Sequence, residues 1–325
     1  MLNRYYRYGL TKQRICRIWG ISIKSFYTNT VAPLETGSIL HRIQLNRITP
    51  EEYDAVFLYA LSHTELRHRE MAYRMIDDNV AFMSPTSVYR ILRACNLISN
   101  NSLKKNHPVW NPHQTPKEPD ELWQADLTYI RYRYRYYYLL VFLDVFSRFI
   151  VYFQLLIQMT GSTISDAFKE ALEKTGQHPA LQTDNDSSFI SHEFRSVITH
   201  AQIEHHFIHP SCPNENAEIE RVNRTIKEGI DPVDASSLQE LQILIKERIE
   251  YYNFKRYHSS IGFITPYIKY RGNPEVVLND RKRKLEIAKI KRMQCNWKEQ
   301  QNMKETVKNN TITVSKSSPK ILASV

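Results

Sequence analysis

The sequence predicts an α/β protein in which a single mixed sheet is flanked by helices and preceded by an all-helical region. Three observations predict this class. Residues 123–157 contain three apolar and aromatic runs in close succession, which is typical of antiparallel strands. Helical patterns and short strand patterns then alternate as far as about residue 230. The residues up to about 98 instead carry helical patterns.

Length and composition limit the class of protein. A chain of 325 residues with 42% hydrophobic and 24% charged residues can form two globular domains. Its net charge of +10 favours a polyanionic partner. No apolar run reaches the roughly 18 residues that a membrane span needs, and the first residues lack the apolar segment of a secretory signal. We therefore expect a cytoplasmic protein.

Charge is distributed unevenly along the chain. Residues 1–119 carry 16 basic and 9 acidic side chains, whereas residues 120–230 carry 10 basic and 15 acidic ones. Residues 281–320 are again basic, with 12 basic and 3 acidic side chains. This distribution suits an enzyme that acts on phosphodiesters, because basic ends can hold DNA phosphates while central carboxylates bind metal. For the tail alone, an ordinary solvated charge run is an equal alternative.

Two helix–turn–helix units are predicted near the amino terminus. In the first, Thr11 and Ser22 can cap two helices that are separated by a turn at Gly20. In the second, a helix over residues 65–78 precedes a helix that Ser84 caps. Two such units fit a bipartite DNA-binding region.

The helix that follows Ser84 has two distinct faces. Its apolar stripe consists of Val88, Ile91, Leu92 and Cys95. Arg90 and Arg93 lie on the outward face, where we expect them to contact a DNA groove. We interpret residues 1–105 as a helix–turn–helix DNA-binding region, with a generic helical bundle as the alternative.

Composition indicates the remaining boundaries. Residues 99–119 are polar and contain four prolines, so we assign a linker to residues 106–119. Residues 120–270 hold the patterns of the α/β domain and of the helix that follows it. Residues 271–325 form a basic tail, which we expect to be partly disordered because its end is rich in Asn, Ser and Lys.

Within the α/β domain, the period of the apolar pattern indicates the elements. We predict three strands, in residues 123–130, 136–146 and 148–157. They are followed by a helix, a strand, a helix, a strand and two helices, in residues 162–176, 179–183, 191–201, 203–208, 215–230 and 236–255. Arg131, Arg133 and Arg135 alternate with tyrosines, so we expect their guanidinium groups on one strand face.

Three acidic residues stand out by their context. Asp126 lies among apolar neighbours within the first predicted strand, where an unpaired charge would be costly. Asp184 follows a short strand where the chain enters a loop, and 35 residues separate it from Glu220. On its helix, Glu220 shares a face with Arg224 and Lys227, beside the apolar stripe. Such a helix can pack on the sheet and still direct a carboxylate toward the strand ends.

These carboxylates predict a metal site. Three converging carboxylates would raise one another's pKa unless a cation lay between them. Mg²⁺ accepts oxygen ligands, and a pair of these ions can assist an in-line phosphoryl displacement. The four cysteines lie far apart without a CxxC pair, which disfavours zinc. Each acid taken alone is more often a surface carboxylate paired with arginine, but the three together favour a metal site.

Several segments resemble the transposases of insertion sequences that have a DDE-type catalytic core like that of retroviral integrases. The resemblance covers roughly residues 60–270 and is carried by SPTSVYRILRACNLI, WQADLTYI, LLVFLDVFSRFIV, LQTDNDSSF, PNENAEIERVNRTIKE and YNFKRYHSSIGFITP. Its most specific motif is the order Asp, Asp, a gap of 35 residues and Glu, with Asn216 and Arg221 around the glutamate.

The resemblance implies an RNase H-like fold for the mixed sheet and a triad of catalytic, metal-binding residues. The triad consists of Asp126, Asp184 and Glu220, holding two Mg²⁺ ions for which Mn²⁺ can substitute. Arg224 and Lys227 match helix positions at which the family places basic side chains against DNA.

The implied activity is that of a bacterial DNA transposase. Such an enzyme is a polynucleotidyl transferase that cleaves the ends of an element and transfers the strands into target DNA. The resemblance implies double-stranded DNA as the partner and a homo-oligomer as the DNA-bound form. We expect it to be associated with the nucleoid when it is bound to DNA.

The chain departs from the family pattern after the second acid. The usual Asp-Asn-Gly is replaced by Asp184-Asn185-Asp186. Glycine permits a positive φ, which aspartate adopts at a modest cost, and the Asp186 carboxylate adds negative charge. We therefore expect a less active site than one with glycine. A catalytically decayed or repurposed DNA-binding protein of the same fold is the alternative, whereas a simple RNase H-like nuclease would not need the helix–turn–helix units.

Overall fold

The computed structural model describes Cys16 and residues 44–98, 116–209 and 213–316. The chain divides into two compact units. Residues 1–103 and 279–325 belong to unit 1, and residues 104–278 form unit 2. The first predicted helix–turn–helix unit, with its proposed caps Thr11 and Ser22, lies outside the described residues.

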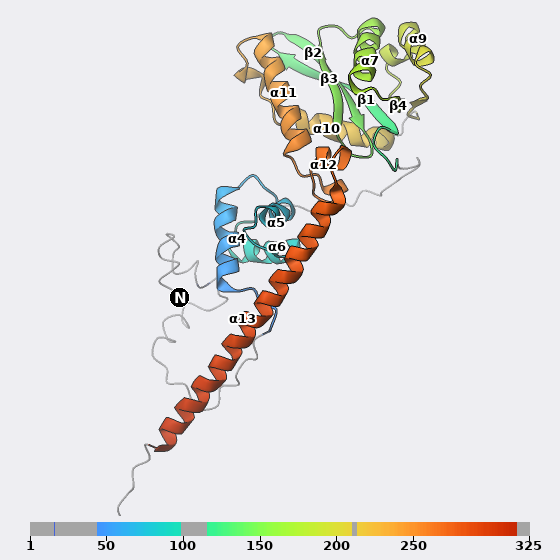
Figure 1. The fold of residues 1–325 in the computed structure, drawn as a ribbon. Helices are drawn as coiled ribbons and strands as arrows, with labels where there is room; N and C mark the ends of the chain where they lie inside the picture. The colour runs from blue at the N-terminus through green and yellow to red at the C-terminus, as the bar shows by residue number, and fades with distance from the viewer. Residues whose placement is uncertain (1–15, 17–43, 99–115, 210–212, 317–325) are drawn as a thin grey trace, which may run out of the picture. The chain divides into compact units, whose positions relative to one another are not determined.

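Three helices form the described amino-terminal part of unit 1, namely α4 (Pro50–Ser62), α5 (His68–Asp77) and α6 (Pro85–Ala94) (Figure 1). The second predicted pair of helices is confirmed as α5 and α6, and the Ser84 hydroxyl caps α6 by accepting from the Ser87 amide at 3.2 Å. Helix α4 was not predicted, although Thr49 and Glu52 form a capping box at its start. The three helices share one apolar core, which includes Val56, Met75 and Ile91.

Helix α13 (Pro274–Lys316) occupies much of the segment in which the sequence indicated a partly disordered tail. The segment has no further proline and no glycine before residue 317, so nothing in it interrupts a helix. Arg281 and Arg292 are buried and form ion pairs with Asp77 of α5 and Glu52 of α4. These two arginines are therefore occupied within unit 1 and do not belong to a solvated charge run.

Unit 2 contains a five-stranded sheet with the strand order β3-β2-β1-β4-β5. The strands are β1 (Leu122–Tyr132), β2 (Arg135–Asp144), β3 (Ile150–Leu156), β4 (Ala180–Thr183) and β5 (His205–Phe207). Strand β2 is antiparallel to both β1 and β3, whereas β4 and β5 run parallel to β1. The predicted mixed sheet is confirmed, and its order is that of the RNase H-like fold.

The expected alignment of three arginines on one strand face is wrong. Strand β1 ends at Tyr132, Arg133 lies in the turn with a φ of 52°, and β2 begins at Arg135. Tyr132 pairs with Arg135, and Arg131 pairs with Tyr136. Because paired residues share a face and neighbours along a strand alternate, Arg131 and Arg135 lie on opposite faces. The alternation of Arg and Tyr crosses a hairpin turn.

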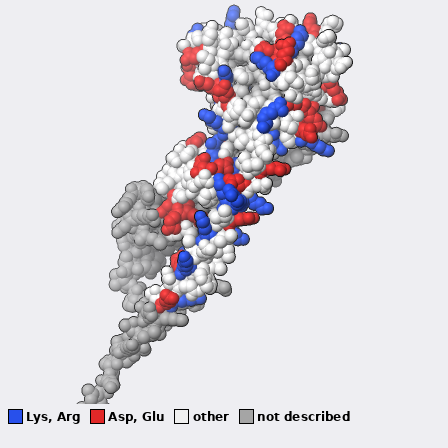
Figure 2. Space-filling view, in the orientation of Figure 1, with Lys and Arg blue, Asp and Glu red and all other residues white. Residues whose placement is uncertain are grey.

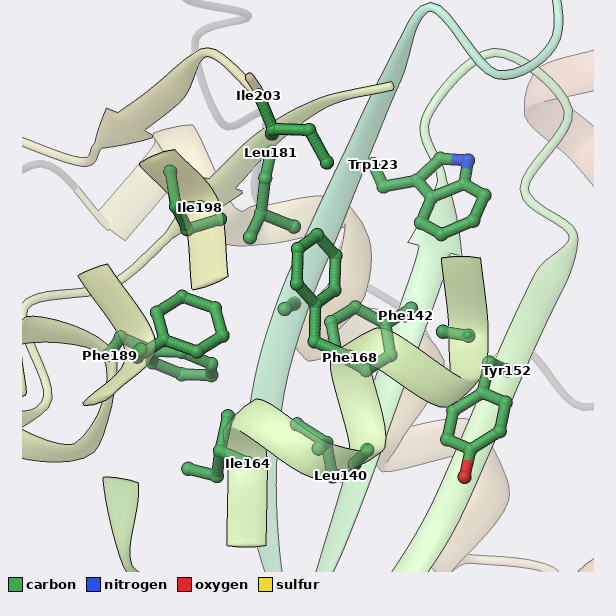
Figure 3. Close-up of a cluster of buried hydrophobic side chains, with 14 of the residues drawn as sticks. Trp123, Leu140, Phe142, Tyr152, Ile164, Phe168, Leu181, Phe189, Ile198 and Ile203 are labelled. Atoms are coloured by element: carbon green, nitrogen blue, oxygen red, sulfur yellow. The ribbon is translucent and has the colours of Figure 1, made fainter. Parts of the chain in front are cut away.

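Helices cover both faces of the sheet (Figure 1). One face packs against α7 (Gly161–Thr175), α8 (Ser187–Ile190) and α9 (His192–His200), and the other against α10 (Ala217–Lys227) and α11 (Leu238–Phe254). The core on the first face is rich in aromatic rings, among them Trp123, Phe142 and Phe168 (Figure 3). The core on the second face includes Val141 of β2, Ile219 of α10 and Leu241 of α11.

Short helical segments complete unit 2. They are η1 (Pro213–Asn216), η2 (Pro232–Asp234), η3 (Ser259–Ile261) and α12 (Pro266–Tyr270). Apart from α8 and these segments, the elements of this unit were predicted from the sequence pattern to within a few residues. In the described ranges, no helix has the length and apolar character needed to cross a membrane.

Candidate active site

Asp126 lies on β1, the central strand of the sheet. Its Oδ2 atom accepts a hydrogen bond of 2.7 Å from the side-chain amide of Asn223 on α10. Burial raises the pKa of Asp126 to about 6, the Asn223 hydrogen bond opposes the rise, and the charges of Asp184 and Glu220 add to it. A nearby cation would favour the ionised form of such a carboxylate.

Asp184 follows β4, and the pairing of β4 with β1 brings it beside Asp126. The parallel register aligns Thr183 with Ala125, and the next residue on each side is the acid. Burial raises the pKa of Asp184. The amide of Asp186, which donates to Oδ1 at 3.1 Å, opposes this rise, and the Asp186 charge adds to it. Two acids from distant parts of the sequence thus share one end of the parallel strand pair.

The backbone of Asp186 does not adopt the conformation that the resemblance led us to expect. Its φ is −62° and its ψ is 142°, which is extended backbone. The Asp186 side chain caps α8 by accepting a hydrogen bond of 2.9 Å from the Ser188 amide. The expected positive φ is wrong because the chain enters a helix here through a side-chain cap and needs no left-handed residue.

Helix α10 presents two stripes toward the sheet and the site. The buried stripe consists of Ile219, Val222 and Ile226. The site stripe consists of Glu220, Asn223 and Lys227, which recur at helical spacing. Asn223 reaches Asp126, and the Lys227 Nζ atom lies 3.3 Å from the Thr128 hydroxyl. The apolar stripe therefore fixes the rotation of the helix that directs Glu220 toward the site.

An open groove of about 500 Å³ follows the site stripe. It is lined by Asp126, Thr128, Glu220, Asn223, Arg224, Lys227 and Glu228. Glu220, Arg224 and Lys227 are exposed. The structure therefore brings four of the predicted site residues to one groove, namely Asp126, Glu220, Arg224 and Lys227. Asp184 does not line the groove, although its charge acts on Asp126.

The donor set fits a hard divalent cation. All three predicted ligands are carboxylates, and a cation would favour their charged forms. The Oδ1 atom of Asn223 is buried and has no hydrogen-bond partner among the described residues, so a further oxygen is available here. In the described part of the chain, however, no three His, Cys, Asp or Glu side chains are arranged to hold an ion. Asp126 and Asp184 instead accept hydrogen bonds from within the protein.

Asn223 is the residue of this site that the sequence analysis missed. It lies three residues after Glu220 and so on the same helical face, which is the signal that would have pointed to it. Arg90 and Arg93 lie apart from this site in the sequence, on α6 of unit 1. Both are exposed, and the apolar residues of α6 are buried as predicted.

Family comparisons match the part of the chain that holds this site. The family model described as integrase core domain matches residues 116–213, and a second model with the same description matches residues 201–266. The strand order and the acidic site lie within these ranges. The two models together cover residues 116–266, so this part of the chain is similar to integrase core domains.

Curated relatives include proteins of bacterial insertion sequences and polyproteins of retroviruses. The chain is 30% identical over 152 residues to the transposase for insertion sequence element IS904 of Lactococcus lactis, covering 46% of this chain and 60% of that protein. It is 26% identical over 265 residues to an uncharacterised 39.2 kDa protein of insertion element IS476 of Xanthomonas euvesicatoria. That match covers 79% of this chain and 71% of the relative. The chain thus spans less than two thirds of the length of the Lactococcus relative.

Solved structures that are similar to this chain include the HTLV-2 integrase catalytic core domain in complex with magnesium. It aligns with a TM-score of 0.41 and 24% identity over 47% of this chain and 98% of that chain. The comparisons therefore show similarity to integrase core domains and to a transposase of an insertion sequence.

Proposed function

We propose that the chain is a DDE-type DNA transposase, which cleaves the ends of its element and transfers them into target DNA. The observation that carries the proposal is the hydrogen bond between Asn223 of α10 and Asp126 of β1. This contact holds the helix that bears Glu220 against the strand that bears Asp126. In an integrase core domain, that arrangement lets acids from β1, β4 and α10 serve one phosphodiester.

We infer that Asp126, Asp184 and Glu220 are the catalytic residues and that they hold two Mg²⁺ ions, for which Mn²⁺ can substitute. When bound, the ions would stabilise charge on the phosphoryl oxygens and activate the attacking water or 3′-hydroxyl. Asn223 keeps Asp126 available as an anion, because its N–H group favours the charged carboxylate.

The groove also contains the cations that would orient a DNA strand. Arg224 and Lys227 line it together with the acids, and their side chains are exposed. Basic and acidic side chains are interspersed on the visible face of the described chain (Figure 2). The phosphates would therefore be bound by individual cations of the groove and not by a general positive field of the protein. These contacts would fix the strand for in-line attack.

The proposed substrate is double-stranded DNA, as element ends and as target. Arg90 and Arg93, exposed on α6, would read the element ends. Joining two ends to one target requires two active sites in one complex, so the proposed active form is a homo-oligomer on DNA. The proposed place of action is the nucleoid of a bacterial cytoplasm.

A strand-transfer assay tests the proposal. The full chain is incubated with Mg²⁺, a target plasmid and duplexes that carry the terminal repeats flanking its gene. Asp126→Asn, Asp184→Asn and Glu220→Gln should each reduce strand transfer on the order of 10³-fold or more, with little change in DNA binding. Glu173→Gln, at an exposed acid of α7, is the matched control and should remain active.

Near-normal transfer by any of the three variants would refute the catalytic assignment. Binding of the repeats by the wild-type chain without any cleavage would favour the DNA-binding alternative.

A further inference from the structure

A group of basic side chains lies where α10 and α11 pack, away from the site stripe. This arginine cluster consists of Arg148, Arg221, Arg248 and Arg256. They come from the turn after β2, from α10, from α11 and from the segment after α11. Two aromatic residues lie among them, Tyr252 and His258, whose ring centroids are 6.2 Å apart. The charges of three of the arginines act on both rings.

A third stripe of α10 holds the cluster in place. It consists of Glu218, Arg221 and Thr225, which recur at helical spacing. The Arg148 guanidinium pairs with Glu218 at 3.1 Å, and the Arg248 guanidinium donates to the Thr225 carbonyl at 3.1 Å. Glu220 and Arg221 are consecutive, so their side chains leave the helix about 100° apart. The cluster therefore adjoins the candidate active site around the same helix.

Three donors in the cluster have no partner. The Arg148 Nη1, Arg248 Nε and Tyr252 hydroxyl groups are buried and make no hydrogen bond within the described chain. Tyr252 is only 1% exposed. Buried polar groups are nearly always paired, so the unpaired donors of Arg148, Arg248 and Tyr252 point to a ligand that accepts hydrogen bonds.

The charge balance indicates that this ligand is an anion. Glu218 pairs with Arg148, and Glu228 acts on Arg248, so two carboxylates face the four arginines. Arg221 and Arg256 form no ion pair among the described residues. His258 adds no charge at neutral pH, because burial and the nearby arginines lower its pKa to about 4. Two positive charges are therefore left without compensation.

We propose that the arginine cluster binds a phosphate of the DNA backbone, next to the phosphate that is cleaved. The inference rests on the proposed function, since it takes the DNA strand in the groove as given. A phosphodiester has one negative charge and free acceptor oxygens, which match guanidinium forks and a phenol hydroxyl. Arg221 and Arg256 supply the charge, and the three unpaired donors supply the hydrogen bonds. The cluster would position the strand and would take no part in the bond change.

The first test uses inorganic phosphate and no DNA. At constant ionic strength, exchanging chloride for phosphate should raise the unfolding temperature of the full wild-type chain. Arg256→Gln should lose most of this rise, and Tyr252→Phe should lose part of it. Arg195→Gln, at an exposed arginine of α9, is the control and should keep the rise in full. Arg221→Gln changes an exposed side chain and replaces Arg256→Gln if that variant does not fold.

The second test measures how the affinity for duplex DNA depends on salt. Arg221→Gln and Arg256→Gln should each flatten the slope of log K against log salt concentration by about 0.9, the value for one phosphate contact. Arg195→Gln should leave the slope unchanged. These slopes separate a phosphate contact from a merely structural role, which would change stability without changing salt dependence.

The outcomes separate this inference from the proposed function. If the wild-type chain transfers strands while the cluster variants keep both the phosphate effect and the slope, the inference alone is overturned. If phosphate stabilises the chain through Arg256 but duplex DNA does not bind, the proposed function fails and the assignment of DNA as the ligand fails with it.

Discussion

The side-chain amide of Asn223 and the carboxylate of Asp126 are joined by a hydrogen bond of 2.7 Å that links α10 to β1. The bond holds the helix of the site against the central strand. It also partly offsets the effect of burial, which raises the pKa of Asp126 to about 6. At neutral pH most Asp126 side chains are therefore ionised, and Asn223 contributes to keeping them so.

Asn223→Ala should reduce activity through the pKa of Asp126. Without the amide donor that pKa rises above about 6, so the acidic limb of the pH–rate profile should shift to higher pH. A shift of one unit would lower transfer about tenfold on that limb. The measurement is strand transfer between pH 5.5 and 8.5. Asn185→Ala, which removes a bond to the Ile208 carbonyl, should leave the limb in place, and an unmoved limb in Asn223→Ala would contradict the prediction.

Asp126→Asn should stabilise the metal-free protein at neutral pH and hardly at all in acid. The pKa of Asp126 is about 6 in the folded chain, above its ordinary value of 3.8. Between these values the folded state binds more protons, so stability falls as pH rises from about 4 to 6 and stays reduced above that. Asparagine removes this loss, which is worth about 1–3 kcal/mol.

Urea denaturation in the presence of a chelator, at pH 4.5 and pH 7.5, measures this effect. The free-energy difference between Asp126→Asn and the wild type should be clearly larger at pH 7.5. An equal difference at the two pH values would mean that the carboxylate is not held in an unfavourable environment.

Asp186→Asn separates two effects of the unusual residue. Asparagine keeps the capping acceptor for the Ser188 amide and removes the charge that raises the pKa of Asp184. We expect Asp186→Asn and Asp186→Gly to increase strand transfer alike at fixed Mg²⁺ and pH near 6, because both remove the charge. An increase in the glycine variant only would instead point to backbone conformation, and no increase in either would mean that Asp186 is neutral for activity.

Arg90→Gln and Arg93→Gln should each weaken the preference of the full chain for element ends. Both side chains lie on the exposed face of α6, so each loss should remove a contact in a DNA groove, worth about 1–3 kcal/mol if it is to a base. The measurement is the ratio of affinities for terminal-repeat and random duplexes. Arg69→Gln, at an exposed arginine of α5, should leave this ratio unchanged. The same ratio in all variants would remove α6 from end recognition.

These experiments need the full chain, because α13 contributes to unit 1. Asp77 of α5 and Glu52 of α4 find their partners on that helix, in Arg281 and Arg292. A fragment that ends at residue 105 would leave both carboxylates without these partners.

The sequence was sufficient for most of unit 2, because its elements have strong local patterns. The apolar run of β2 is buried throughout its second half, and α10 has a single apolar stripe. Such periods are set by burial and are visible without a structure. The parallel pairing of β4 with β1 follows from the order of elements, and it brings Asp184 to Asp126. The pattern of carboxylates also indicated a metal site, and the resemblance added the catalytic roles of these acids.

Other features depend on contacts between residues far apart in the sequence. Arg281 reaches Asp77 across 204 positions, and no local pattern indicates that a basic segment will be neutralised in this way. Arg and Tyr alternate regularly through the hairpin turn at Arg133, so the sequence does not show where one strand ends and the next begins. Asp186 could be compared only with a family pattern, whereas its actual conformation is set by the helix that it begins.

The three stripes of α10 constrain its length more strictly than its composition. Each residue advances the helix by about 100°, so one deletion between Glu220 and Lys227 would exchange the apolar, acidic and arginine-bearing sides beyond that point. Substitutions on one side leave the other two in place. Over evolutionary time this helix should therefore accumulate replacements while rejecting insertions and deletions, and distant relatives should align through it without a gap even where few letters still agree.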